Sequence, residues 1–232
     1  MSIMRFDIIT IFPNVFEGYL NESMFKRAKA KKLLDIRVHD LRDFAPQGKK
    51  SLPAKMRSFR RVDDRPFGGG PGMVLQAEPL IKAVNKIAVK KLKPLVLITV
   101  AAGKQFDSKL AAKFSNEKQI IIIAGHYEGI DERIKKLVRD SGLRIIGISS
   151  GPYVLTGGEL PAMIIVDAVS RHIPGFLGKA ESLEETRHGV GIPAYTRPEV
   201  LKYKGKTYKV PPILLTGHHM NIENWRRGRL KK

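Results

Sequence analysis

Three glycine-containing loops in this sequence carry residue types suited to binding a ligand. They are AAGKQF (101–106), GHYEGIDER (125–133) and YVLTGGELPAM (153–163), and each follows an apolar run. Glycine lets a backbone approach a ligand closely, and Glu128 in the second loop can face a cationic ligand. His126 could act as a base, although a lone loop histidine is more often simply solvated. These residues indicate a small-molecule site that accepts positive charge.

A second kind of chemistry is indicated by DDRPFGGGPGM (63–73), which has four glycines within five positions. It is neither a phosphate loop nor a dinucleotide fingerprint, because no Lys-Ser/Thr follows it and no apolar strand precedes it. By itself the run is more typical of a flexible surface loop. Its neighbour, segment 48–61, has six basic residues and no acids. A cationic segment that leads into an approachable backbone is suited to gripping a nucleic-acid strand.

The charge of the 232-residue chain is strongly positive, with 42 Lys and Arg against 22 Asp and Glu and a net charge of +20. Such an excess repels itself within a fold, and binding to a polyanion is its usual explanation, with nucleic acid ahead of a membrane surface. A lysine-rich proteome is the alternative. Hydrophobic residues make up 43%, which supports a packed core. The absence of cysteine excludes disulfides, a thiol nucleophile and cysteine-ligated metal.

The N-terminus gives the expected location. Arg5 and Asp7 interrupt its apolar run, which argues against a signal peptide. No apolar run reaches the ~18 residues that a membrane span requires. We therefore expect a cytoplasmic protein that does not enter a membrane.

Five apolar, β-branched runs are predicted to be strands, and five other segments are predicted to be helices. The strands are 3–12, 33–41, 94–102, 119–127 and 143–151, and the helices are 15–32, 79–92, 108–116, 131–141 and 159–172. In the first helix Phe16, Leu20, Met24 and Ala28 recur at i+4 and predict one buried stripe. Apolar strands that alternate with helices indicate an α/β fold with a parallel sheet covered on both faces. Ligands bind at the carboxyl ends of such strands, so the three glycine loops should share one site.

The pattern changes near residue 174, where Gly, Pro and acids mix without periodicity. We expect an α/β domain over 1–175, an interdomain linker over 176–190 and a small, mainly helical domain over 191–232. From Gly191 onward ten Lys and Arg stand against two Glu. This last domain is therefore strongly basic, which favours binding to a polyanion.

Four motifs resemble one enzyme family. VDDRPFGGGPGM, GHYEGIDER, YVLTGGELPAM with DAVSR, and YTRPEV occur in order along nearly the whole chain, as in the bacterial tRNA (guanine-N1-)-methyltransferases of the SPOUT, or trefoil-knot, class. The resemblance implies a deep C-terminal knot in the α/β domain and a homodimer with its active site at the subunit interface. It implies S-adenosylmethionine bound in a bent form as cofactor. It also implies methylation of guanine N1 at the guanosine immediately 3′ of the tRNA anticodon, which supports the reading frame.

The resemblance assigns the cofactor pocket residue by residue. The implied contacts are Val100, Ala101, Ala102, Gly103, Gly125, Tyr127, Glu128, Ser150, Gly151, Pro152, Tyr153, Val154, Leu155, Gly157 and Gly158. DDRPFGGGPGM is implied to meet the cofactor and guanine from the partner subunit. Within the catalytic and cofactor-binding domain that the resemblance implies for 1–175, the chain departs from the family at His126 and Pro152, where the family commonly has Arg and Asp. The 191–232 domain, which the resemblance implies binds tRNA, is shorter than that of the family.

The implied reaction needs a base and a cation, because guanine N1 carries a proton and charge develops on O6. Arg171 matches the family arginine credited with holding that charge, and an i, i+4 salt bridge with Asp167 is its structural alternative. The family base is an aspartate in the linker, but Thr186 aligns with it here. A hydroxyl is too weak a base, so Glu185 is the first candidate and Glu184 the second. The alternative is that both acids are solvated linker charges.

The expected tRNA contacts, centred on the anticodon stem-loop, are Lys49, Lys50, Arg57, Arg60, Arg61, Asp64 and Arg197. Family members are described as Mg²⁺-dependent, yet the sequence has no dense carboxylate cluster typical of a tight metal site, and no metal ligand is assigned. Two alternatives stay open: a related knotted methyltransferase acting on ribosomal RNA or a ribose hydroxyl, and a noncatalytic RNA-binding relative. The glycine loops, Glu128 and Arg171 argue against the noncatalytic alternative.

Overall fold

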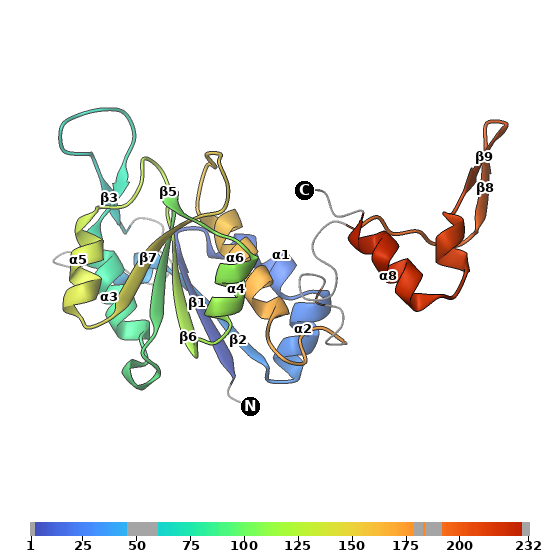
Figure 1. The fold of residues 1–232 in the computed structure, drawn as a ribbon. Coiled ribbons are helices and arrows are strands. Elements are labelled where there is room, and N and C mark those ends of the chain that lie inside the picture. Colours follow the sequence, from blue (N-terminus) through green and yellow to red (C-terminus); the bar gives the residue numbers. More distant parts are fainter. Residues whose placement is uncertain (1–2, 46–59, 179–182, 184–191, 229–232) are drawn as a thin grey trace. The chain divides into compact units, whose positions relative to one another are not determined.

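The computed structural model describes residues 3–45, 60–178, 183 and 192–228 (Figure 1). The chain forms two compact units, Met1–Leu177 and Gly178–Lys232. The division between them falls within the segment expected to be a linker, 176–190.

A five-stranded parallel sheet in the order β2-β1-β6-β5-β7 forms the centre of the larger unit (Figure 1). This confirms the predicted parallel α/β architecture. Four of the five predicted runs contain a whole strand, and the fifth, 94–102, contains the start of a strand that continues to Gln105. The strands are β1 (Met4–Thr10), β2 (Leu34–Asp40), β5 (Leu95–Gln105), β6 (Gln119–Ala124) and β7 (Arg144–Ser149).

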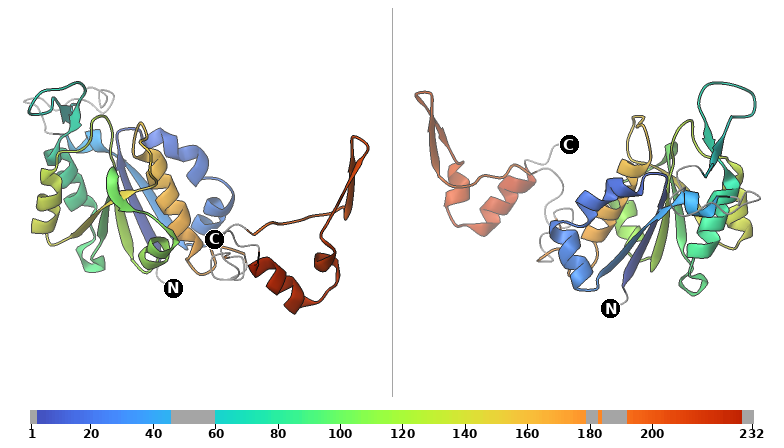
Figure 2. Two further views of the ribbon diagram at one scale, coloured as in Figure 1. Left: turned by 45° about the horizontal axis from the view of Figure 1, so that its top comes forward. Right: turned by 180° about the vertical axis from the view of Figure 1, so that it is seen from behind.

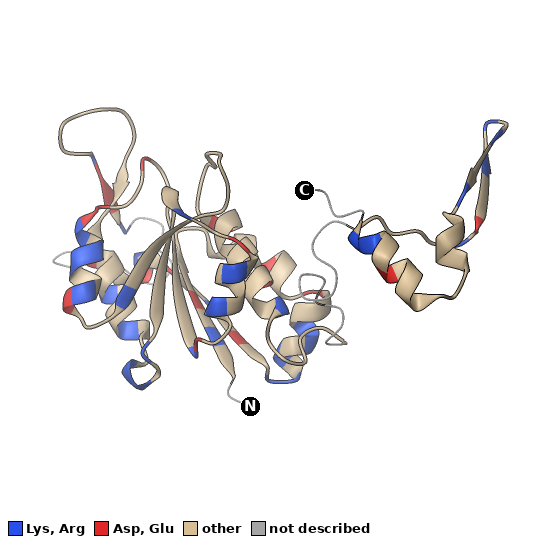
Figure 3. Ribbon diagram, viewed as in Figure 1, with Lys and Arg blue, Asp and Glu red and all other residues tan. Residues whose placement is uncertain are grey.

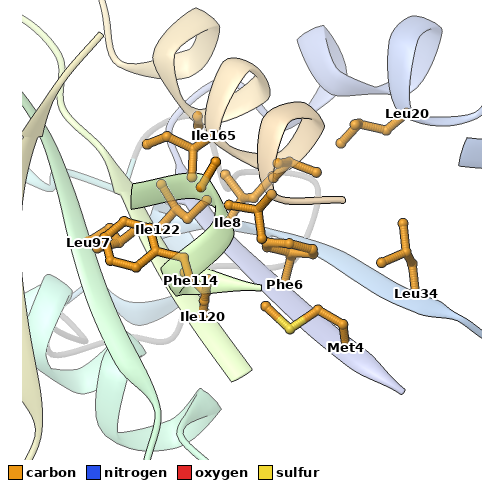
Figure 4. Close-up of a cluster of buried hydrophobic side chains, with 14 of the residues drawn as sticks. Met4, Phe6, Ile8, Leu20, Leu34, Leu97, Phe114, Ile120, Ile122 and Ile165 are labelled. Carbon is orange, nitrogen blue, oxygen red and sulfur yellow. The ribbon is translucent and has the colours of Figure 1, made fainter. Parts of the chain in front are cut away.

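Side-chain alternation along the central strands explains why the sheet is covered on both faces. In β6, Ile120 and Ile122 join a core cluster on one face, whereas Ile121 and Ile123 join a second cluster on the other. Figure 4 shows the first cluster, in which Ile122 and its neighbours pack beneath Ile165 of the covering helix. Continuous isoleucine runs are what a strand buried on both faces requires.

Helices cover both faces of this sheet, as the views in Figure 2 show. The helical elements of the larger unit are η1 (Pro13–Phe16), α1 (Glu17–Leu20), α2 (Ser23–Ala30), η2 (Leu41–Phe44), α3 (Ala77–Ile87), η4 (Lys90–Leu92), α4 (Ser108–Phe114), α5 (Arg133–Asp140) and α6 (Glu159–Arg171). Segment 15–32 is broken into three pieces rather than one helix, since the chain turns before Ser23, whose φ is 45°. The predicted stripe is nevertheless buried at Phe16, Leu20 and Ala28.

β5 leaves its ladder with β7 at the carboxyl end of the sheet. The register shifts between Thr99 and Lys104, so residues 100–103 bulge out of the pairing. A Cβ on Gly103 would lie only 2.6 Å from backbone atoms of Ile148. Glycine is therefore needed at position 103, where the chain returns to pair with β7. The bulge leaves residues 100–102 outside the ladder, at the carboxyl end of the sheet.

The smaller unit contains a β-hairpin as well as helices. Its elements are β8 (Val200–Tyr203), β9 (Lys206–Lys209), η6 (Pro212–Leu215) and α8 (His219–Arg227). This differs from the mainly helical domain expected from the sequence. Among the described residues of the chain, no helix has the length and apolar character needed to cross a membrane.

Candidate functional site

A cavity of about 510 Å³ opens at the carboxyl ends of β5, β6 and β7, where the strand-end rule places a ligand. Three segments line it, one after each strand. Eleven residues that the sequence assigns to a cofactor are among them: Val100, Ala101, Gly125, Tyr127, Glu128, Ser150, Tyr153, Val154, Leu155, Gly157 and Gly158. The three glycine loops therefore share one pocket.

Four residues assigned to the cofactor lie beside this cavity rather than in its wall. Gly103 packs on the backbone of β7, and Ala102 and Pro152 are exposed. Gly151 is buried, and its carbonyl accepts a 2.9 Å hydrogen bond from the hydroxyl of Ser149. Gly103 and Gly151 thus shape the loops from behind.

The third loop is seated between the ends of β5 and β6 with no room for a side chain. The Gly158 amide donates a 2.6 Å hydrogen bond to the Gly125 carbonyl. A Cβ on Gly158 would collide with the Thr99 hydroxyl and approach the Gly125 nitrogen to 2.5 Å. This close packing explains the second glycine of TGGE.

The second loop holds its aromatic residue in an unusual backbone conformation. Tyr127 has φ 58°, in the left-handed region that few non-glycine residues occupy. Partial burial, and then the charge and hydrogen bonding of Asp63, raise the pKa of Tyr127 above its ordinary value. Strain of this kind collects at ligand sites, and Tyr127 lines the cavity.

The glycine run is fastened to this second loop. β3 (Asp63–Asp64) and β4 (Val74–Leu75) pair at its base, and the amide of Glu128 donates a 3.0 Å bond to the Met73 carbonyl. A Cβ on Gly72 would lie 2.5 Å from Cγ of Glu128. Phe67, 99% exposed, stands on the run. Glu128 therefore connects the glycine run to the loop that lines the cavity.

A buried carboxylate lies beneath the third loop. Glu159 is 8% exposed, and its Oε1 accepts a 2.8 Å hydrogen bond from the Thr10 hydroxyl. Nδ1 of His126 lies 3.7 Å from its Oε2. Within the described part of the chain this buried nitrogen has no hydrogen-bond partner. His126 also pairs with Gly157 through an isolated backbone bridge, so the histidine joins the second loop to the third.

Several wall residues were not assigned from the sequence. Thr99, Ile130, Lys135 and Pro161 line the cavity, and so does His126. Thr99 had a readable signal, because it is a polar residue at the end of an apolar strand. It is 5% exposed, and its hydroxyl accepts a 3.2 Å bond from the Gly125 amide.

Arg171 is the last residue of α6, whereas the cavity lies at the first turn of that helix. Twelve residues separate it from Glu159, which at 1.5 Å per residue is about 18 Å along the axis. Arg171 is not among the described residues that line this cavity. Asp167 lies on α6 between Glu159 and Arg171, and its carboxylate accepts a hydrogen bond from the Tyr19 hydroxyl. This hydrogen bond raises the pKa of Tyr19 to about 12.

The expected tRNA contacts are only partly visible. Lys49, Lys50 and Arg57 lie outside the described residues, as do Glu184, Glu185 and Thr186. Arg60, Arg61, Asp64 and Arg197 are described. Arg61 lies 3.7 Å from Asp63 and 3.6 Å from Asp64. Figure 3 shows how the charged residues are distributed over each unit.

The described residues contain no recognisable set of metal ligands. No group of three or more His, Cys, Asp or Glu there is arranged to hold an ion. The magnesium requirement raised by the sequence therefore gains no assigned ligands.

Comparison with known proteins gives one consistent family. Residues 4–232 match the family described as "tRNA (Guanine-1)-methyltransferase TrmD". A tRNA (guanine-N(1)-)-methyltransferase of Geobacter sp. (strain M21) is 42% identical over 227 residues, 97% of this chain and 84% of the relative. The protein of the same name from Persephonella marina (strain DSM 14350 / EX-H1) is 43% identical over 228 residues, 97% of this chain and 82% of the relative.

Proposed function

The chain belongs to the tRNA (guanine-1)-methyltransferase family, and on that premise we propose that it methylates N1 of the guanosine immediately 3′ of the tRNA anticodon, with S-adenosylmethionine as methyl donor. The chain is thus a tRNA-modifying methyltransferase, and we place it with its substrate in the cytoplasm. The cavity built from three strand-end loops is the observation that carries this proposal.

The residues present fit such a cofactor. A volume of about 510 Å³ lies within the range of small-molecule sites, and the glycines at 125, 157 and 158 leave backbone groups at the wall. Glu128 supplies a carboxylate that favours the cationic amino and sulfonium groups. When bound, S-adenosylmethionine supplies the methyl group. The chain's own residues hold it, orient it and manage the guanine proton.

We propose a homodimer that completes each site, and the position of Arg171 supports this arrangement. An arginine about 18 Å along α6 from the pocket cannot serve the cavity of its own chain without a large movement. A two-fold partner can bring its arginine to that cavity. Leu160 and Ile164, one helical turn apart on α6, are 56% and 41% exposed, and they would form part of the interface.

We also propose that the third loop completes a trefoil knot. The chain leaves β7 at the edge of the sheet, and Gly158 is then seated against Thr99 and Gly125 at the ends of β5 and β6. Residues 104–105, past the bulge of β5, pair with β7 below this path. This close crossing of three segments supports a threaded topology.

In the proposed reaction Arg171 of one subunit holds the charge that develops on guanine O6. Glu185, with Glu184 second, accepts the N1 proton while N1 takes the methyl group. The methyl–sulfur bond of the donor would break with its electron pair left on sulfur, which gives the neutral thioether. The Arg60–Arg61 segment and Arg197 contact tRNA phosphates, together with Lys49, Lys50 and Arg57, and Asp64 orients Arg61. Because its glycines have no side chains, the run 68–72 of the partner subunit can come close to the guanine.

The test is methyl transfer to unmodified tRNA. Purified protein is incubated with S-adenosylmethionine labelled in its methyl group, and the nucleosides of the product are separated. We expect label only in 1-methylguanosine, and only in transcripts with guanosine 3′ of the anticodon. Label in a ribose 2′-O-methyl nucleoside, or in ribosomal RNA alone, would favour a related knotted enzyme. Binding of tRNA without any transfer would favour a noncatalytic relative.

A further inference from the structure

The β8–β9 hairpin of the smaller unit is a ribbon with two chemically different faces. Its strands pair as Val200 with Lys209, Leu201 with Tyr208, Lys202 with Thr207 and Tyr203 with Lys206. Directly opposed residues share a face, and neighbours along a strand point to opposite faces. One face therefore has Leu201, Tyr203 and Tyr208 with one lysine, and the other has Lys202 and Lys209.

The turn adds another cation at the tip of the ribbon. Lys204 and Gly205 connect the strands with φ of 47° and 73°, as in the two-residue turns with positive φ at both positions that favour tight hairpins. Nζ of Lys204 lies 5.5 Å from the centre of the Tyr203 ring, within the range of a cation–π contact. Sequence 200–209 has four lysines and no acid, and Figure 3 shows basic residues along the ribbon.

The described part of the chain leaves the ribbon uncovered. All eight strand residues are exposed, including Leu201 at 55%, Tyr203 at 60% and Tyr208 at 52%. A two-stranded hairpin is marginal in water unless a face is covered. Two exposed tyrosines and a leucine on one face indicate a surface that is covered in use.

We infer that this ribbon binds unpaired nucleotides of the substrate tRNA, an inference that rests on the proposed function. Tyr203 and Tyr208 stack on bases, while Lys206 of the same face and Lys204 of the turn contact flanking phosphates. Charge complementarity selects this occupant, because lysine is depleted from the cores of protein interfaces but suits a phosphate backbone. Aromatic faces recognise splayed RNA bases at the same time.

The test compares three double variants of the full chain by tRNA binding across a series of salt concentrations. Lys204→Gln with Lys206→Gln should lower the slope of log affinity against log salt by about 1.4, since each single-strand phosphate contributes ~0.7. Tyr203→Ala with Tyr208→Ala should weaken binding tenfold or more, as loss of base stacking predicts, and leave that slope unchanged.

Lys90→Gln with Lys91→Gln is the matched control. These exposed lysines belong to η4, which precedes β5 and so lies at the end of the sheet opposite the cavity. This variant should bind tRNA nearly as the parent does. Circular dichroism of the ribbon variants checks that the unit still folds.

Unchanged affinity and slope in both folded ribbon variants would overturn the inference. Unchanged tRNA binding with an altered sedimentation coefficient in the tyrosine variant would assign the face to protein contact instead. The proposed function fails separately, if the parent transfers no methyl group to tRNA. In a functional enzyme the ribbon variants should raise KM for tRNA and leave kcat at saturating tRNA unchanged.

Discussion

Nδ1 of His126 faces Oε2 of Glu159 across 3.7 Å, and the other oxygen of that carboxylate is held by the Thr10 hydroxyl. Both side chains are largely buried, at 21% and 11% exposed. The pair lies directly beneath Gly157, where a Cβ would approach Nδ1 of His126 to 2.6 Å. The histidine thus supports the pocket from below and joins two of its loops.

We predict that His126→Ala weakens S-adenosylmethionine binding about tenfold, equivalent to ~1.4 kcal/mol, because the second loop loses the imidazole that packs beneath Gly157 and lies 3.7 Å from Glu159 of α6. His126→Arg should restore binding, since a guanidinium can reach Glu159. Isothermal titration with the cofactor measures both. His219→Ala, in α8, is the control and should bind normally. An alanine variant with parent affinity would reduce His126 to a passive wall residue.

Gly158→Ala should destabilise the larger unit by about 2 kcal/mol or more, within the range of buried overpacking. The added methyl group meets the Thr99 hydroxyl and two backbone atoms, so no single side-chain movement relieves it. Gly18→Ala is the matched control, because nothing lies within 4 Å of its Cβ and alanine favours a helix. Thermal unfolding of both variants gives the comparison, and equal midpoints would contradict the close packing.

Arg171→Ala should retain cofactor binding and lose turnover by roughly 10²-fold or more, as removal of a charge-stabilising group predicts. Single-turnover methyl transfer at saturating cofactor and tRNA measures the loss. Arg171→Lys should recover part of the rate.

Mixed dimers test whether Arg171 acts across the subunit interface. Arg171→Ala and Glu128→Ala chains are unfolded together and refolded. Random association makes half of the refolded dimers mixed. If the arginine serves its partner's pocket, each mixed dimer has one intact site, so the mixture should have about a quarter of the parent activity. A mixture as inactive as its two components would place Arg171 and the cavity of its own chain in one site.

Glu185→Gln should slow methyl transfer by 10²-fold to 10⁴-fold, the usual contribution of a general base, with a smaller effect for Glu184→Gln. Thr186→Ala is the control and should transfer near the parent rate. Pre-steady-state transfer measures all three. Parent rates in both glutamine variants would move the base to Asp167 or to a water molecule.

Asp7 gives a pH prediction that concerns stability. Burial alone would raise its pKa, but hydrogen bonds from His39, Arg5 and Gln119 outweigh burial and hold the pKa of Asp7 below its ordinary value. Its stabilising contribution is therefore full above the unfolded-state value of ~3.9 and is lost as pH falls through the lower folded value. The free energy of unfolding measured in urea should fall more steeply below about pH 4 for the parent than for Asp7→Asn.

The same variant should cost roughly 1.5–3 kcal/mol at neutral pH, the range for hydrogen bonds to a charged group. Asp35→Asn is the control. Its ion pair with Arg37 is exposed, so its loss should change stability by less than about 1 kcal/mol. Equal acid profiles for the parent and Asp7→Asn would show that other carboxylates dominate.

The fold could be predicted where burial dictates sequence. Runs such as IIIIA in β6 must be buried on both faces, and that alone indicates a parallel sheet and a site at the strand ends. The β8–β9 hairpin was missed because its apolar residues remain exposed, so its period-two pattern did not stand out from the surrounding lysines. Its Lys-Gly turn was the available signal.

The site could be predicted as a set of loops but not as a set of contacts. Glycines mark where the backbone approaches closely, yet only the fold shows that Gly158 is seated on Thr99 while Gly103 is packed behind the wall. The relation of His126 to Glu159 joins segments 33 residues apart, and no local pattern encodes it. The distance of Arg171 from the cavity follows from helix rise only after the helix start is known.

The seating of Gly158 between Thr99 and Gly125 also sets an order in which this protein can mature. During synthesis β5 and β6 leave the ribosome first, yet the pocket wall is incomplete until residues 150–158 have returned from the far edge of the sheet. Such late, non-local closure is slow and leaves apolar surface exposed in the meantime. A ligand that touches all three segments would stabilise only the closed state, so we expect the supply of the proposed cofactor to affect how much of the newly made chain survives as well as how fast the finished enzyme works.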